Sequence, residues 1–196
     1  MTRNDVTVQI MLGGLSTRMG RDKAMVTLGG KTLLERAVER WNGYGAGIQL
    51  SVGGAERSAL APEAIPAVAD VYPERGPLGG IHAGLSVCET PLMLVVAVDS
   101  PFLTCEQADR LLQAIGEAGA CVYTIEGRPQ PLFGLYRREC RSLAETMILS
   151  GDNRMRLLLE GCETVYVPAD DATRFLNLNT PEELAEAETL LAGMKK

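Results

Sequence analysis

Residues 6–23 read VTVQIMLGGLSTRMGRDK, an apolar run that becomes a glycine-rich turn carrying hydroxyls and cations. A run such as residues 6–12 is typical of a strand that is buried inside a sheet. In the turn that follows, glycine lets backbone N–H groups come close to an anion, and Arg18 and Lys23 supply positive charge. The pattern indicates a phosphate-binding turn, with polyphosphate as the first ligand to consider. Composition alone is equally compatible with a surface loop bearing two solvated cations, so the rest of the chain has to decide.

Two familiar phosphate-binding motifs are excluded by the spacing of this turn. Five residues separate Gly14 from Gly20, and Arg21-Asp22-Lys23 follows, so the turn is not the G-x-x-x-x-G-K-[ST] loop of P-loop NTPases. The G-x-G-x-x-G pattern of dinucleotide-binding folds is also missing from it.

Length and composition favour a single domain over residues 1–196 that binds a small substrate. The chain is 46% hydrophobic, which is enough for one sizeable core. It carries 25 acidic against 19 basic residues, and this balance argues against a nucleic acid or a membrane surface as partner. We expect neither a membrane span nor a signal peptide, because no apolar run is long enough and the first five residues are polar.

The cysteines and the histidine point away from disulfides and from metal sites of the zinc type. Five cysteines are scattered along the chain without a C-x-x-C pair, so neither a disulfide framework nor a zinc site is predicted. A reducing cytoplasm fits this usage. His82 is the only histidine, which excludes sites built from several imidazoles, and we expect it to be structural.

The longest apolar run, residues 92–98, predicts a central strand of a parallel sheet, buried on both faces. It ends at Asp99, and open α/β sheets bind their ligands at the carboxyl ends of such strands. Asp99 is therefore a candidate metal ligand. The alternative is a carboxylate that only caps a turn or a helix.

The remainder of the chain alternates predicted strands and helices. Residues 76–80 are interpreted as a second glycine loop leading into an apolar helix at 81–87. Residues 127–131 are interpreted as a break between two strands that pair antiparallel at the sheet edge. Further strands are expected at 48–52, 67–69, 121–124, 132–136 and 164–167, and helices after the capping residues Thr32, Thr104 and Thr180. The alternation predicts an α/β fold: a three-layer α/β/α sandwich around a mostly parallel, Rossmann-like sheet.

Four motifs follow one another along the chain: Gly13-Gly14-x-Ser16-x-Arg18-Met19-Gly20-x-Asp22-Lys23, Gly76-Pro77-Leu78-x-Gly80, Asp99-x-Pro101-Phe102 and Asn177-x-Asn179-Thr180-Pro181-Glu182-Glu183-Leu184. In this order they closely resemble the motifs of the molybdenum cofactor guanylyltransferases, which have the nucleotidyltransferase fold. The resemblance covers nearly the whole chain.

The resemblance implies a role for each matching residue. It implies that Arg18, Lys23 and Asp99 are catalytic and that Asp99 and Asn179 hold magnesium. The residues that it implies for GTP binding are Met11, Leu12, Gly13, Lys23, Ser51, Asp70 and Asp99. Two of these depart from the family pattern, since Leu12 stands where the family has alanine and Ser51 where it has a base-contacting asparagine. The larger Leu12 is expected to crowd the base.

The implied reaction is attack of the terminal phosphate of molybdopterin on the α-phosphorus of GTP, with loss of pyrophosphate. The alternatives are a cytidylyltransferase acting on the same pterin, another nucleotidyltransferase, and a non-catalytic protein that delivers the cofactor. Molybdoenzymes or their chaperones are the implied protein partners of a monomer or weak homo-oligomer. Candidates for the pterin surface, by charge and position, are residues 129–136, Arg154 and Arg156.

Overall fold

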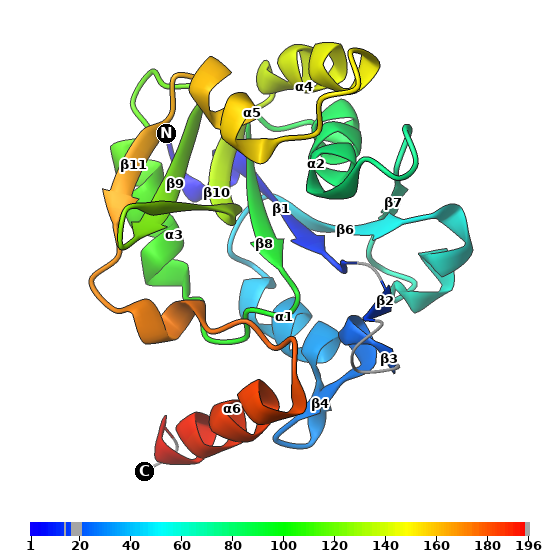
Figure 1. Cartoon of the computed structure of the whole chain (residues 1–196), viewed down its shortest axis with the longest axis vertical. Coiled ribbons are helices and arrows are strands. Elements are labelled where there is room, and N and C mark those ends of the chain that lie inside the picture. Colours follow the sequence, from blue (N-terminus) through cyan, green and yellow to red (C-terminus); the bar gives the residue numbers. More distant parts are fainter. Residues whose placement is uncertain (14, 17–20, 195–196) are drawn as a thin grey trace.

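The centre of the molecule is a seven-stranded sheet with the order β11-β9-β10-β8-β1-β6-β7 (Figure 1). The computed structural model describes residues 1–13, 15–16 and 21–194. The strands of the sheet are β1 Val6–Met11, β6 Gly47–Gly53, β7 Ala67–Ala69, β8 Leu92–Ala97, β9 Ala120–Ile125, β10 Arg128–Arg137 and β11 Val165–Pro168. Two small antiparallel pairs accompany it: β2 Leu15–Ser16 with β3 Arg21–Asp22, and β4 Thr27–Leu28 with β5 Lys31–Thr32.

Helices cover both faces of this sheet, so the expected three-layer fold is confirmed (Figure 1). On one face α2, α4 and α5 pack over residues such as Met93 and Val122. On the other face α1 and α3 pack over residues such as Val8 and Leu94. The helices are α1 Leu33–Trp41, α2 Gly76–Val87, α3 Cys105–Ala114, α4 Cys140–Leu149, α5 Met155–Gly161 and α6 Pro181–Met194.

Strand β1 lies in the parallel part of the sheet and pairs in parallel with β6 on one side and with β8 on the other. Strand β8 is fully buried from Leu92 to Val96, as its apolar sequence predicted. Its second neighbour, β10, runs antiparallel to it, and β11 returns parallel to β9. The sheet is thus mostly parallel, and the carboxyl ends of β1, β6, β7 and β8 meet at one edge.

The predicted antiparallel pair of β9 and β10 is confirmed, but its expected place at the sheet edge is wrong. Strand β11 adds beyond β9, which leaves β10 inside the sheet. The expected break is also wrong, because a two-residue turn at Glu126 and Gly127, both with positive φ, lets β10 start at Arg128. Prolines 129 and 131 are tolerated there because β8 pairs only with residues 133–137.

Helix α2 begins at Gly76, so the expected second glycine loop is in fact the first turn of the helix. Pro77 fits there because the first helical residues need no N–H partner. Its glycines let the helix lie close to the sheet, since a Cβ on Gly84 would come within 1.7 Å of Gln9 Oε1. Gln9 Nε2 donates to Gly80 O at 2.8 Å, and Gln49 Nε2 donates to Gln9 Oε1 at 2.7 Å. This buried network fixes α2 against the middle of β1 and β6.

Candidate active site

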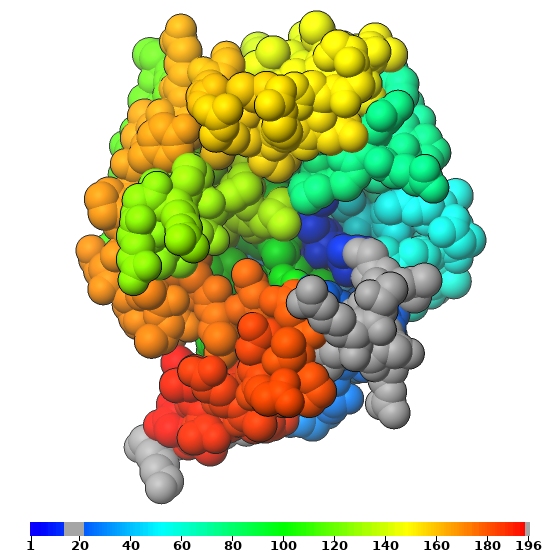
Figure 2. Space-filling view, in the orientation of Figure 1, coloured from blue at the N-terminus to red at the C-terminus, as the bar shows by residue number. Residues whose placement is uncertain are grey.

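A hollow of about 780 Å³ opens where β1, β6, β7 and β8 end. In the space-filling view the blue end of β1 and the green end of β8 lie recessed in the middle of the face (Figure 2). Most of the residues that sequence reasoning selected for nucleotide binding line this hollow, namely Met11, Leu12, Gly13, Ser51, Asp70 and Asp99. Open α/β sheets bind ligands at this edge, so the hollow is the candidate active site.

The glycine turn starts directly after β1. Leu12 N donates to Ser51 O at 3.0 Å, which carries the β1–β6 pairing one residue past the strand. Gly13 then takes φ of +68°, a conformation that glycine adopts without strain and that ends the strand. Leu12 is fully buried and belongs to the hydrophobic core on the α1 side. Leu12 also lines the hollow, so the expectation that its larger side chain crowds a base stays a prediction.

Lys23 joins the two predicted metal ligands. Its Nζ lies 2.6 Å from Asp99 Oδ2 and also donates to Asn179 Oδ1. The Lys23 and Asp99 side chains are each less than one fifth exposed, so this ion pair is only weakly screened by solvent. Asp99 and Asn179 lie 76 and 156 positions after Lys23 in the sequence, yet both contact its ammonium group.

Local structure explains how each of these three residues reaches that point. Lys23 begins the short 3₁₀ helix η2, Lys23–Met25, which is capped by the Asp22 carboxylate accepting from Ala24 N at 3.0 Å. Asp99 follows β8, and its carbonyl accepts from Leu178 N at 2.9 Å, which docks the C-terminal segment onto the strand end. Asn179 directly precedes the capping box that starts α6.

Asp70 lies at the end of β7, where its N–H donates to Gly53 O at 2.7 Å. Its Oδ1 is buried and has no hydrogen-bond partner among the residues that the structure describes. Burial raises the pKa of the Asp70 carboxyl to about 6. A buried acceptor of this kind is costly by itself and suits a ligand that brings N–H donors.

The other predicted site residues fall into three groups. Arg18 lies outside the described residues. Of the segment 129–136, Leu132 lines the hollow. Arg154, which occupies the N-cap position of α5, and Arg156 on that helix are exposed and form ion pairs with Asp152 and Glu160, respectively. Nothing in these pairs connects the two arginines to the hollow.

Sequence reasoning missed Arg57, which lines the hollow from the 3₁₀ helix η3, Ala55–Leu60. Its guanidinium forms an ion pair with Asp22 at 2.7 Å and donates to the carbonyls of Gly13 and Val52. No sequence motif predicts the role of Arg57, because its partners lie up to 44 residues away in the sequence. The only signal was its position shortly after a strand that ends in two glycines.

The donor set fits magnesium and does not fit a zinc-type site. No group of three or more His, Cys, Asp or Glu side chains able to hold a metal occurs within the described residues. Asp99 and Asn179 instead offer oxygen atoms that face the same cation, the Lys23 ammonium. Magnesium commonly takes one or two protein oxygens and completes its octahedron with water and substrate phosphates.

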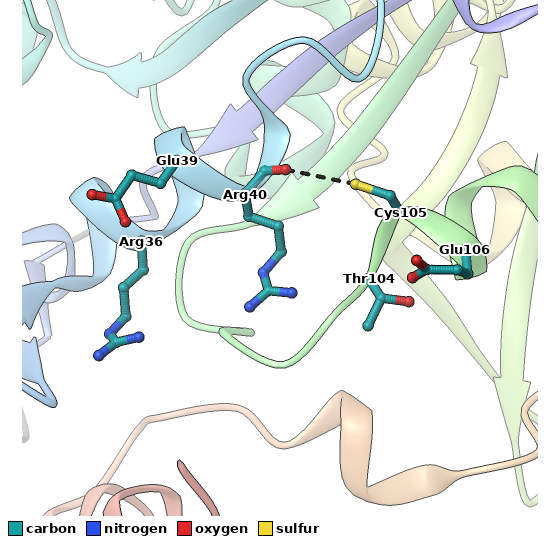
Figure 3. A pocket seen from close by; sticks show the side chains of 6 residues that line it. All are labelled: Arg36, Glu39, Arg40, Thr104, Cys105 and Glu106. Carbon is teal, nitrogen blue, oxygen red and sulfur yellow. Dashed lines mark hydrogen bonds between the residues drawn. The ribbon is translucent and has the colours of Figure 1, made fainter. Parts of the chain in front are cut away.

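A second hollow, of about 380 Å³, lies between α1 and α3 (Figure 3). Arg36 and Arg40 face it together with Glu39 and Glu106, so its charges balance. Burial raises the pKa of the Cys105 thiol, which donates to Arg40 O at 3.6 Å. A protonated thiol and balanced charges provide neither a nucleophile nor an anion site.

The fold and the site define a class, the α/β nucleotidyltransferases. Solved structures of other proteins share the fold, among them the following two. Molybdopterin-guanine dinucleotide biosynthesis protein A from Archaeoglobus fulgidus superposes with a TM-score of 0.83 at 27% identity, covering 96% of this chain and 100% of that one. The 2-C-methyl-D-erythritol 4-phosphate cytidylyltransferase from Thermus thermophilus gives 0.69 at 20% identity, covering 94% and 98%, a likeness of fold alone.

Within this class the chain belongs to the family of the MobA-like NTP transferase domain, whose sequence profile matches residues 8–168. The molybdenum cofactor guanylyltransferase of Vibrio atlanticus is 35% identical over 186 residues, 92% of this chain and 94% of that protein. The enzyme of the same name from Ralstonia nicotianae is 34% identical, covering 93% and 96%. The resemblance seen in the four sequence motifs is thereby confirmed. In the described part of the chain, no helix has the length and apolarity needed to cross a membrane.

Proposed function

We propose that this enzyme is a molybdenum cofactor guanylyltransferase. It transfers GMP from GTP to the terminal phosphate of molybdopterin and releases pyrophosphate, giving molybdopterin guanine dinucleotide. The observation that carries the proposal is the contact of Lys23 with Asp99 and Asn179 at the hollow, in a chain of this family. The start of the glycine turn and the strand-end carboxylate Asp99 line one space that is large enough for a nucleotide, and Lys23 contacts that carboxylate.

The reaction places few demands on acid–base chemistry. A phosphate monoester has a second pKa of about 6 and is largely ionised near neutral pH, so the acceptor needs no general base. What it needs is alignment of the two phosphates and neutralisation of charge on the departing pyrophosphate. Lys23 and the backbone N–H groups of the glycine turn supply positive charge and dipoles in our proposal, and Arg18 adds a second cation.

Magnesium is part of the proposal, with Asp99 and Asn179 as its protein ligands. When bound, it would neutralise phosphate charge and stabilise the leaving pyrophosphate. Lys23 contacts both oxygens in this structure, and we propose that it exchanges that contact for a triphosphate oxygen.

Asp70 and Ser51 are the proposed contacts for the base. Guanine offers N–H donors, and the Asp70 carboxylate is a buried acceptor on the wall of the hollow that lacks a partner among the described residues. Ser51 is 4% exposed beside it on β6 and has a shorter reach than asparagine. Guanine can donate from N1–H and from its 2-amino group to the two oxygens of a carboxylate, whereas cytosine has only its 4-amino group, so we expect Asp70 to favour guanine over cytosine.

The proposal also covers the surface that binds the pterin, the cellular compartment and the protein partners. Leu132 lines the hollow from β10, so we place the pterin on that side. All five cysteines are free thiols, which supports a reducing compartment such as the cytoplasm. Molybdoenzymes or their chaperones would receive the product from a monomer or a weak homo-oligomer.

The test is a nucleotide panel. Purified protein, MgCl₂ and molybdopterin are incubated with GTP, CTP, UTP or ATP, and pyrophosphate release and the dinucleotide product are quantified. We expect turnover with GTP that requires both the pterin and the metal. Turnover with CTP but not GTP would make the enzyme a cytidylyltransferase, and GTP binding without pyrophosphate release would favour a delivery protein.

A further inference from the structure

The Arg57 side chain holds both ends of the glycine turn. Its Nε and Nη2 donate to Asp22 Oδ2 at 3.1 and 2.7 Å, and its Nη1 donates to Val52 O at 2.9 Å and to Gly13 O. Gly13 is the second residue after β1, and Asp22 directly precedes Lys23. One guanidinium therefore connects the entry of the turn, its exit and the end of β6.

The end of the glycine turn, at Asp22 and Lys23, contains the cation that we propose for the reaction. Asp22 accepts from Ala24 N and so caps the short helix η2 that starts with Lys23. The Lys23 ammonium in turn reaches Asp99 and Asn179. A shift of the Asp22 carboxylate would therefore move the backbone from which Lys23 extends.

Arg57 has little capacity left to bind a ligand itself. A guanidinium has five N–H donors, and four of them are used in the bonds to Asp22, Gly13 and Val52. The Arg57 and Asp22 side chains are only 14% and 16% exposed, so their attraction is weakly screened. The arrangement is that of a clamp rather than of a free cation waiting for phosphate.

We infer that Arg57 and Asp22 form a positioning pair for the transferase reaction, which sets the glycine turn and Lys23 at the distance that the triphosphate requires. In this inference both residues act through the turn and neither contacts the reacting atoms. The inference rests on the proposed function, because it explains how the same site is kept in order. Its physical basis is that the guanidinium fork places two N–H groups on one oxygen, Asp22 Oδ2, while its third nitrogen holds two carbonyls, and the single ammonium of a lysine does not reproduce this set of bonds.

The experiment compares Arg57→Lys, Asp22→Asn and the double variant with the wild type. Arg57→Lys keeps the charge but loses the fork, and Asp22→Asn keeps the shape and the cap acceptor but loses the charge. Steady-state kcat and KM are taken from pyrophosphate release with GTP, and calorimetry gives the Kd of Mg·GTP. Arg110→Ala, which breaks the exposed arginine pair with Asp170, is the matched control.

We expect each single variant to lose about 10- to 100-fold in kcat/KM, the usual effect of removing a group that orients another. The double variant should lose no more than the worse single one, because both disrupt the same clamp. Arg110→Ala should stay within about twofold of the wild type. Melting temperatures of all variants are recorded, and kinetics are measured well below the lowest of them.

Two results would overturn the inference. Wild-type kcat/KM in Arg57→Lys would show that charge alone suffices, and losses that multiply in the double variant would show two independent roles. Failure of the proposed function looks different, since the wild type itself would then transfer no GMP. In that case the Kd of whichever nucleotide the wild type binds is compared across the same variants, and an unchanged Kd would overturn the clamp as well.

Discussion

Replacing Asp70 by asparagine should change how the stability of the protein depends on pH. Burial raises the pKa of this carboxyl from its ordinary 3.8 to about 6, and its Oδ1 has no partner among the described residues. One pH unit corresponds to about 1.36 kcal/mol, so ionising Asp70 in the folded protein costs at most about 3 kcal/mol. Solvent reaches this half-buried side chain, which reduces the expected cost to about 1–2 kcal/mol.

The sign follows from proton binding. Between pH 4 and 6 the folded protein holds a proton on Asp70 that the unfolded chain has already released, so this group stabilises the fold at low pH. That contribution is present below about pH 4 and is lost as the pH rises to about 6. In Asp70→Asn it is missing, because the amide does not titrate.

The assay is urea unfolding of wild type and Asp70→Asn at pH values from 4 to 8. Other titrating groups are shared by the two proteins and cancel in the difference. As the pH rises from 4 to 7, we expect the free energy of unfolding of the variant to increase by about 1–2 kcal/mol relative to that of the wild type. The affinity of the variant for Mg·GTP should be lower than that of the wild type. A difference in unfolding free energy that stays constant with pH would refute the reasoning about Asp70.

Three further substitutions test other parts of the molecule. Asp99→Ala should lower kcat about a thousandfold or more, because metal charge stabilisation is worth several kcal/mol, and circular dichroism should show a folded protein. An unfolded variant would contradict its role as a ligand. Lys23→Ala should weaken Mg·GTP binding about tenfold or more in calorimetry, since a charge-assisted bond is lost; unchanged affinity and rate would exclude a phosphate contact. Gly84→Ala should cost about 1–3 kcal/mol in urea unfolding, because its Cβ would lie 1.7 Å from Gln9 Oε1. The control is Gly193→Ala, whose Cβ meets nothing within 4 Å, and equal losses in both would contradict the packing argument.

Features that depend on local sequence were predictable. The three capping boxes at Thr32, Thr104 and Thr180 all form, because each needs only residues three apart. The buried run of β8 was predictable for the same reason, since a strand covered on both faces has to be apolar. The meeting of the glycine turn with Asp99 followed from the rule that parallel strands end at one edge.

Features that depend on neighbours in space were not predictable. Pro129 and Pro131 read as a break, yet they lie in a strand because β8 ends before it would need their N–H groups. The sequence at Gly76 and Pro77 is typical of a loop, yet these residues begin helix α2. The glycines of this helix allow it to pack closely against Gln9 on strand β1. Arg57 belongs to no motif, because its role comes from partners elsewhere in the chain. The roles of the individual site residues stay predictions until the variants are measured.

The contact between Lys23 and Asn179 has a consequence for synthesis on the ribosome. Asn179 follows β11, which ends at Pro168 and is the last strand of the sheet to be translated. A nascent chain therefore contains every strand before it contains the amide oxygen that Lys23 contacts. Translation of the final stretch, rather than of the core, delivers the complete set of side chains at the hollow.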